Sequence, residues 1–200
     1  MTWQSPMNIH EPEGATPLSP EMLDGLIPGL TTQQELNEFE QLNIASAMRW
    51  AKRSRKLDKE LVSMEALRFL HRKMLEDVWS WAGQFRVKDT NIGVSWHQIP
   101  EQLLKLCANV TYWQENKTWS LDEIAVRFHH KLVQIHPFPN GNGRHARLVA
   151  DLMVQHEGRA PFSWGRHAIG VSGETRDTYL KALRLADRHQ IERLLEFARG

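Results

Sequence analysis

The segment from His136 to Arg147 combines the side chains and the backbone freedom that an anion site needs. Gly141 and Gly143 allow backbone N–H groups to converge, and a helix that starts there adds unpaired N–H groups and a positive dipole end. Arg144 and Arg147 would lie in the first turn of that helix, where the dipole opposes positive side chains. A negative ligand would compensate them, so the segment predicts an anion site beside an imidazole.

The glycines of this segment also match part of two nucleotide-binding fingerprints. Gly141–Ala146 satisfies G-x-G-x-x-A, but that fingerprint needs a preceding strand and an acidic residue about 20 positions later. Here the preceding run has a helical period, and residues 160–167 contain no acid. A P-loop is excluded because no Gly-Lys-Ser/Thr follows the glycines. For the arginines alone, an ion pair between Arg147 and Asp151 is the structural alternative.

Histidines at four nearby positions, His136 among them, suggest zinc as a further ligand. None of them has the HExxH spacing, and the single cysteine, Cys107, supplies neither a cysteine pair nor an internal disulfide. His129 and His130 are therefore expected to be packing or surface residues, and His145 is expected to be solvated.

The composition fits one ordinary domain. A chain of 200 residues with 41% hydrophobic content can bury a core of its own. The 25 basic and 24 acidic residues leave a net charge of +1, which gives no general attraction for nucleic acid or anionic lipid. The amino terminus lacks the order of a signal peptide, and no apolar run is long enough to span a membrane. We expect a cytoplasmic protein without membrane or nucleic-acid partners.

Apolar residues recur every three or four positions along most of the chain, which predicts a mostly helical protein. Residues 1–30 are rich in proline and glycine, show no such period and predict an extended arm. Residues 86–99 mix strand-forming with turn-forming residues, which favours a small β-hairpin. The capping box of Thr32 and Glu35 predicts the start of a first helix of about six turns. Further helices are expected over residues 62–78, 121–135, 143–158, 173–187 and 190–198.

Residues 136–147 resemble the signature of the Fic/Doc family, His-Pro-Phe-x-Asp/Glu-Gly-Asn-Gly/Lys-Arg-x-x-Arg. Eleven of the twelve positions fit. The resemblance extends upstream to the stretch from Phe69–His71 through Trp79–Arg86 and downstream to Tyr179–Asp187, and so covers most of the chain beyond residue 60. The arm, residues 35–50 and Asn140 together resemble the bacterial subgroup called mobile mystery protein B.

The resemblance implies a helical Fic-type domain over residues 31–200, with a small β-hairpin flap at residues 86–99. The implied activity is protein adenylylation, in which AMP moves from ATP to a Tyr, Thr or Ser hydroxyl of a target protein. His136 would be the general base, because an imidazole pKa of about 6.5 suits proton transfer at neutral pH. Asn142 and Arg144 would complete the catalytic set, and the nucleotide would be bound by Gly141, Asn142, Gly143, Arg144 and Arg147.

Asn140 departs from the family signature, which has an Asp or Glu there as a ligand for Mg²⁺ between the α- and β-phosphates. A neutral carbonyl oxygen is a poorer partner for this cation than a carboxylate. The resemblance therefore implies ATP as the substrate and Mg²⁺ as a weakly held cofactor, with Asn140 as its ligand. It also implies that a target segment docks on the flap beside Val94 and Trp96 by adding a strand to its edge.

Some members of the family carry an upstream inhibitory helix whose glutamate pairs with the second motif arginine. Residues 31–55 would supply that helix here, with Glu40 meeting Arg147 and Glu35 capping the helix. Glu35 is the alternative inhibitor, and an ordinary solvated glutamate is the alternative for both. Two other functions stay open: a Doc-like toxin that transfers a phosphoryl group, and a non-catalytic nucleotide- or protein-binding relative, suggested by Asn140. A toxin-like role would bring an antitoxin-like partner.

Overall fold

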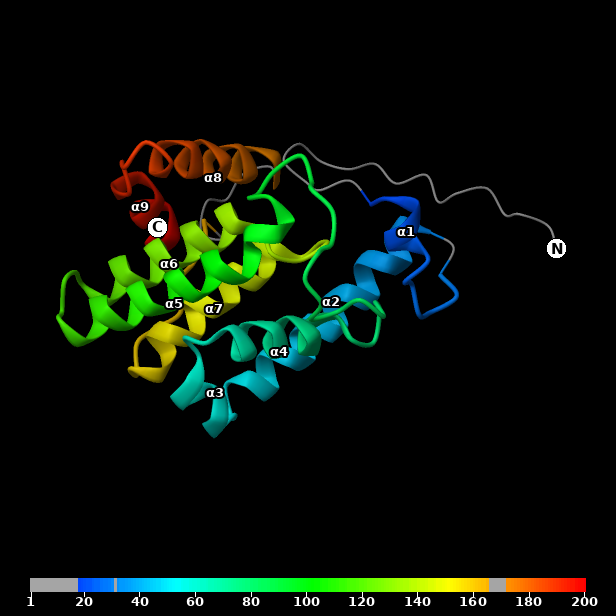
Figure 1. The fold of residues 1–200 in the computed structure, drawn as a ribbon, viewed down its shortest axis with the longest axis horizontal. Coiled ribbons are helices and arrows are strands. Elements are labelled where there is room, and N and C mark those ends of the chain that lie inside the picture. Colours follow the sequence, from blue (N-terminus) through cyan, green and yellow to red (C-terminus); the bar gives the residue numbers. More distant parts are fainter. Residues whose placement is uncertain (1–17, 31, 166–171) are drawn as a thin grey trace.

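The computed structural model describes residues 18–30, 32–165 and 172–200, and these fold into a helical bundle (Figure 1). No helix among these residues is both long and apolar enough to cross a membrane. The prediction of a mostly helical protein is confirmed. Its elements are α1 Pro20–Leu23, α2 Gln33–Ala51, α3 Arg55–Glu60, α4 Met64–Leu75, a 3₁₀ helix at Trp96–Gln98, α5 Ile99–Glu115, α6 Leu121–Ile135, α7 Asn142–His156, α8 Ser172–Ala186 and α9 Glu192–Arg199.

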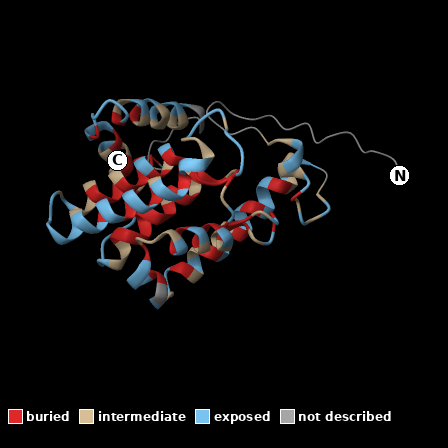
Figure 2. Ribbon diagram, viewed as in Figure 1, coloured by how far each residue is buried: buried red, intermediate tan, exposed pale blue. Residues whose placement is uncertain are grey.

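Helices α6 and α7 form the centre of the bundle and pack against each other (Figure 1). α5 covers one side of α6, α2 packs on α4, and α8 packs on α9, which in turn contacts α6. Buried residues are concentrated on the two central helices (Figure 2). Because α6 and α7 are joined by residues 136–141, the densest part of the core supports that turn.

The predicted helices form with small shifts at their ends, and α6 has the predicted bounds. α2 begins at the predicted capping box: the Thr32 hydroxyl accepts the Glu35 N–H at 3.2 Å, and the Glu35 carboxylate accepts the Thr32 N–H at 3.0 Å. Three helices, α1, α3 and α5, were not predicted. Pro100 stands in the first turn of α5, where a missing N–H breaks no helical bond, so this proline marks the start of a helix.

The hairpin predicted over residues 86–99 does not form. Residues 86–95, which we call the flap loop, are irregular, and the remainder is the 3₁₀ helix and the start of α5. The guanidinium of Arg86 bonds to the carbonyls of Lys88 and Val94. A side chain, and not a ladder of backbone bonds, therefore closes this loop.

Residues 18–30, the described part of the predicted arm, lie against the segment that follows α4. They contain α1, which Ser19 caps, and an isolated antiparallel bridge between Leu26 and Trp79. Residues 1–17 lie outside the described residues. The bridge attaches the arm directly to the segment that leads from α4 into the flap loop.

Candidate active site

The turn between α6 and α7 forms because the chain cannot continue as a helix. Pro137 and Pro139 lack the N–H that a helix interior requires. His136 ends α6 in the left-handed conformation, with φ 54° and ψ 60°. Gly141 precedes α7 with φ 76°, a conformation that glycine adopts without steric strain. The amino-terminal end of α7 is thus placed beside the imidazole that ends α6.

Phe138 and Asn142 brace this turn from inside. Phe138 is fully buried, and its N–H donates to the Asn142 Oδ1 at 2.9 Å. The Asn142 Nδ2 donates to the Phe138 carbonyl at 2.8 Å. The amide predicted to contact phosphate is therefore engaged with the main chain of the turn. A phosphate at this position would instead meet the backbone N–H groups at the start of α7.

The imidazole of His136 is buried, with 6% of the residue exposed. Burial and, next in size, the positive charge of Arg86 lower its pKa to about 4, against the opposing effect of a hydrogen bond with the Val133 backbone. The pKa of His136 in the folded chain is therefore lower than the unperturbed imidazole value of about 6.5. At physiological pH the imidazole is neutral, which is the form that accepts a proton.

A cavity of about 1090 Å³ opens beside the turn, large enough for a ligand of nucleotide size. It is lined by His136, by all residues from Asn140 to Arg144 and by Arg147, so the structure brings the predicted motif residues to one cavity. Trp164 lies in its wall, whereas Trp50 packs edge-on against a ring of α4.

The flap loop lines this cavity through Ile92 and Gly93. The two flap residues predicted from the sequence, Val94 and Trp96, are not part of the lining. Trp96 stacks on His97 with ring centroids 3.5 Å apart. The flap loop thus reaches the site one or two residues earlier than predicted, because it folds without the register of a hairpin.

Glu40 reaches into the cavity from α2 and pairs with Arg144. The Glu40 Oε2 accepts a bond from the Arg144 Nη1 at 2.6 Å, and the Glu40 Oε1 accepts one from the Trp79 Nε1 at 2.7 Å. Only 7% of Glu40 is exposed, so the solvated alternative is wrong. The predicted pairing of Glu40 with Arg147 is also wrong, since Arg144 is the motif arginine that faces α2.

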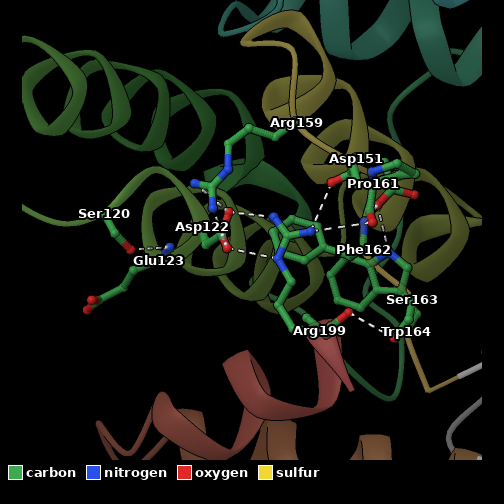
Figure 3. Close-up of polar contacts among 12 residues, drawn as sticks. Ser120, Asp122, Glu123, Asp151, Arg159, Pro161, Phe162, Ser163, Trp164 and Arg199 are labelled. Carbon is green, nitrogen blue, oxygen red and sulfur yellow. Dashed lines mark hydrogen bonds and ion pairs between the residues drawn. The ribbon is translucent and has the colours of Figure 1, made fainter. Parts of the chain in front are cut away.

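Arg147 faces α8. Its guanidinium lies over the ring of Tyr179 at 5.3 Å. The Tyr179 hydroxyl is 3.0 Å from the Nε2 of His129, whose ring packs on Trp164 with centroids 4.6 Å apart. The Trp164 Nε1 donates to the Asp151 Oδ1 at 2.9 Å, one helical turn beyond Arg147 (Figure 3). A continuous set of buried contacts therefore orients the second motif arginine.

A model of the Fic/DOC family matches residues 61–154, from the residues before α4 to near the end of α7. A bacterial relative, "Probable protein adenylyltransferase y4lH" of Sinorhizobium fredii, is 31% identical over 134 residues, which are 63% of this chain and 67% of that protein. The chain belongs to the Fic/DOC family. The turn over residues 136–147 is thus a Fic motif loop, as the sequence predicted, while membership of the mobile mystery protein B subgroup stays a prediction.

Two nematode proteins extend the comparison. "Protein adenylyltransferase fic-1" of Caenorhabditis briggsae is 31% identical over 130 residues, which are 63% of this chain and 24% of that protein. The chain therefore spans about a quarter of the length of that relative. The solved structure of Fic-1 from Caenorhabditis elegans has a TM-score of 0.63 and 26% identity, and the match covers 88% of this chain and 51% of that chain. The Fic fold is shared over nearly the whole of the present chain.

His71 of α4 supports the Fic motif loop and was not among the predicted site residues. Its Nδ1 accepts the Gly83 N–H at 2.9 Å, which leaves Nε2–H to donate to the Asn140 carbonyl at 3.0 Å. The ring stacks on Phe138 with centroids 3.7 Å apart. Burial lowers its pKa well below the usual value, so the ring stays a neutral bridge. The signal in the sequence was a histidine adjoining the apolar stripe of α4.

His145 lies beside His71 and is fully buried, so the expectation that it is solvated is wrong. Its Nε2 donates to the Leu67 carbonyl at 3.0 Å, and burial lowers its pKa to about 3. His145 sits on the face of α7 that packs against α4. Its role is to tie the first turn of α7 to that helix.

The residues at the motif loop do not fit a protein-bound Mg²⁺ ion. The Asn140 Oδ1 is neutral and accepts the N–H of Gly141. Among the described residues, no three His, Cys, Asp or Glu side chains converge on a point where a metal could lie. Glu40, the acid at this end of the cavity, is occupied by Arg144. The side chains around the motif loop therefore do not form a metal site by themselves.

Ion pairs join the start of α6 to the segment after α7 and to α9 (Figure 3). Asp122, in the first turn of α6, accepts bonds from Arg199 at 2.8 Å (Nε–Oδ2) and 2.5 Å (Nη2–Oδ1). It also accepts one from Arg159 at 3.0 Å. The Arg199 guanidinium lies 4.1 Å from the centroid of the Phe162 ring. These contacts place α9 against the loop that carries Trp164.

Proposed function

We propose that this Fic protein transfers AMP from ATP to a hydroxyl group of a target protein. The observation that carries the proposal is a neutral, buried imidazole at the rim of a cavity that also holds a helix amino terminus and two arginines. The relatives named as protein adenylyltransferases support the same chemistry. Because the chain spans only part of the nematode proteins, the activity is assigned on the site of this chain.

In the proposed reaction the target hydroxyl oxygen attacks the α-phosphorus while its proton passes to His136. The bond from that phosphorus to the bridging oxygen of pyrophosphate breaks, and pyrophosphate leaves. Backbone N–H groups at the start of α7 hold the phosphate oxygens. Arg144 and Arg147 offset negative charge on the leaving group. A bound triphosphate also raises the pKa of the adjacent imidazole, which makes it a stronger base once the substrate is present.

The target would dock on the flap loop. Val87 at its start is 68% exposed, and Ile92 near the cavity is 38% exposed, so apolar side chains flank the route to His136. A target segment would pair with the exposed backbone of this loop as an added strand, which aligns the hydroxyl without requiring much target sequence. Val94 and Trp96 then support the loop from behind.

The same site carries its own inhibitor. Glu40 occupies the guanidinium of Arg144, so a phosphate must displace this carboxylate before the arginine can serve. For this reason we propose that the chain inhibits itself through Glu40. An antitoxin-like partner and a toxin role stay predictions. Self-modification of a Glu40→Gly variant measures the inhibition directly.

ATP labelled separately at the α and γ positions tests the function. We expect α label on protein from the wild type and from Glu40→Gly, and a loss of at least about two decades in rate for His136→Ala. His189→Asn, at an exposed histidine, is the matched control. Label from the γ position would instead identify a Doc-like phosphoryl transfer. Absence of both labels, with Glu40→Gly included, would identify a non-catalytic binding protein and overturn the proposal.

A further inference from the structure

Arg86 is a buried cation at the start of the flap loop. Only 3% of the residue is exposed. An acid within ion-pair range is Asp89, with 3.6 Å between its Oδ1 and the Arg86 Nη1, and the Asp89 side chain is 66% exposed. Burying a guanidinium is unfavourable unless hydrogen bonds replace its water. Its position must therefore be explained by the groups that it binds.

The guanidinium donates to main-chain carbonyls on two sides. Its Nε donates to the His136 carbonyl at 2.7 Å, and its Nη2 donates to the Ile135 carbonyl at 3.4 Å. On the other side it donates to the Lys88 carbonyl at 2.9 Å and to the Val94 carbonyl. The first pair belongs to the end of α6 and the second to the flap loop. One side chain thus joins the general base to the loop on which the target is proposed to dock.

The backbone repeats this connection at both ends of the loop. The Arg86 N–H donates to the Pro137 carbonyl at 3.0 Å, and the Val94 N–H donates to the Ile135 carbonyl at 3.3 Å. Carbonyls at the carboxyl end of a helix have no partner within the helix, and a cation there is favoured by the helix dipole. Arg86 does both for α6: it donates to carbonyls at the end of the helix, and it places a positive charge there.

The main chain of His136 needs such support. Its φ of 54° is unfavourable for a residue with a side chain, and it persists only where neighbours hold it. Gly93 lies directly against it: a Cβ at this glycine would be 2.7 Å from the His136 Cβ and 2.8 Å from the Arg86 Nη2. His136 is therefore in contact with the flap loop through its Cβ and with the buried guanidinium through its carbonyl.

We propose that Arg86 is a positioning residue that holds His136 in its left-handed conformation and keeps it in register with the flap loop. The proposal rests on the proposed AMP transfer, in which the imidazole must meet a hydroxyl delivered by that loop. An arginine is required because its planar fork of N–H donors reaches carbonyls on two sides at once. A lysine carries the same charge on a single nitrogen and cannot do so.

Arg86→Lys is the informative variant, and Arg193→Lys, at an exposed arginine of α9 paired with Glu196, is its control. For Arg86→Lys we expect kcat to fall about 100-fold, because a small displacement of the base is enough to do so. The KM for ATP should stay within about twofold, since the α7 end of the site is untouched. Unchanged kcat would overturn the proposal, and so would a KM that rises in step with the loss of kcat.

Amide hydrogen exchange gives a readout that needs no activity. In Arg86→Lys the Val94 and His136 amides should exchange about tenfold faster or more, while amides inside α7 keep their wild-type rates. Equal exchange of Val94 and His136 in the two proteins would overturn the proposal. This measurement also separates the positioning role of Arg86 from the proposed AMP transfer. A wild type that transfers no AMP would overturn the proposed function, whereas the exchange rates would still test the role of Arg86.

Should Arg86→Lys fail to fold, Gly93→Ala tests the same arrangement with the arginine in place. The added methyl group displaces His136 and the guanidinium, so we expect the same loss of kcat with KM for ATP preserved. Wild-type kcat in Gly93→Ala would show that the contact between flap loop and imidazole does not position the base.

Discussion

Main-chain groups hold most of the polar side chains around the motif loop. The amide of Asn142, the imidazole of His71 and the guanidinium of Arg86 all bond to backbone atoms. Arg144 instead bonds to the carboxylate of Glu40. A phosphate can replace a carboxylate without any change in the backbone, so Arg144 is the group most readily transferred to a ligand.

Asn140→Asp restores the carboxylate that the family signature has at this position. A carboxylate binds Mg²⁺ better than a neutral amide does, so the Mg²⁺ concentration for half-maximal AMP transfer should fall about tenfold, equivalent to about 1.4 kcal/mol. The measurement is α-label transfer over a Mg²⁺ series, with Asn116→Asp on the exposed end of α5 as the control. Superimposable curves for Asn140→Asp and the wild type would contradict this expectation.

Three fully buried histidines, His71, His129 and His145, should make the protein sensitive to mild acid. Burial lowers the pKa of each one in the folded chain. The unfolded chain then binds protons that the folded chain does not, so stability is complete above about pH 6.5 and declines as the pH falls below it. At pH 5.5 each histidine should contribute a loss of about 1.4 kcal/mol relative to neutral pH.

Urea unfolding at pH 7.5 and pH 5.5 measures this loss. His145→Gln keeps a side-chain donor for the Leu67 carbonyl. The free energy of unfolding of this variant should differ less between the two pH values than that of the wild type, by the contribution of one histidine. His189→Asn at the surface should leave the difference unchanged. A wild-type free energy of unfolding that is the same at both pH values would contradict the prediction.

At the scale of elements, the helices with a clear apolar period could be predicted from the sequence. α6 and α7 are examples, and the Fic signature located the site between them. Glu40 was placed on the correct helix but assigned to Arg147 instead of Arg144. The sequence defines which face of α2 is buried, but the packing of α2 on α4, and of α4 on α7, decides which arginine that face meets.

The flap loop could not be predicted, for a related reason. Its residues carry a strand-like composition, yet Arg86 also attaches the loop to carbonyls nearly fifty residues further along the chain, at Ile135 and His136. Local propensity contains no information about such contacts. His71 was missed because a histidine near an apolar stripe looks the same whether it fills space or bridges two backbone segments.

Asn43→Ala should loosen the attachment of α2 and weaken inhibition. The Asn43 Nδ2 donates to the Asp77 carboxylate at 2.9 Å, and its Oδ1 accepts the Asp77 N–H at 3.1 Å, so the amide fixes α2 to the end of α4 one turn beyond Glu40. We expect the free energy of unfolding to fall by about 2 kcal/mol. Self-modification with α-labelled ATP should rise above wild type but stay below Glu40→Gly.

Gln41→Ala, at an exposed position of α2, is the matched control for this variant and should match wild type in both assays. If Asn43→Ala loses stability while its self-modification stays at the wild-type level, the orientation of α2 does not govern the Glu40 contact.

For the whole molecule, ion pairs at the carboxyl end of the chain hold α9 against the start of α6. Asp122 joins the start of α6 to Arg159 and to Arg199 of α9 (Figure 3). Asp122→Asn removes the charge that both arginines face, and its half-buried site should make the loss of unfolding free energy about 2 kcal/mol. Urea unfolding measures it, with Glu123→Gln, the neighbouring acid paired with Arg127 on the same helix, as the control.

We expect the control to lose less than about 1 kcal/mol, as a pair within one helix does. A loss for Asp122→Asn no larger than that of Glu123→Gln would show that this carboxylate does not hold the carboxyl end of the chain against α6.

The bond from Trp79 to Glu40 has a consequence for how the protein is switched on. The indole that holds the carboxylate belongs to the residue that bridges the amino-terminal arm at Leu26. If Glu40 inhibits as proposed, a displacement of the arm would reach its carboxylate through the Trp79 ring. Activation would then require only that the Glu40 carboxylate leave Arg144, without refolding of the bundle.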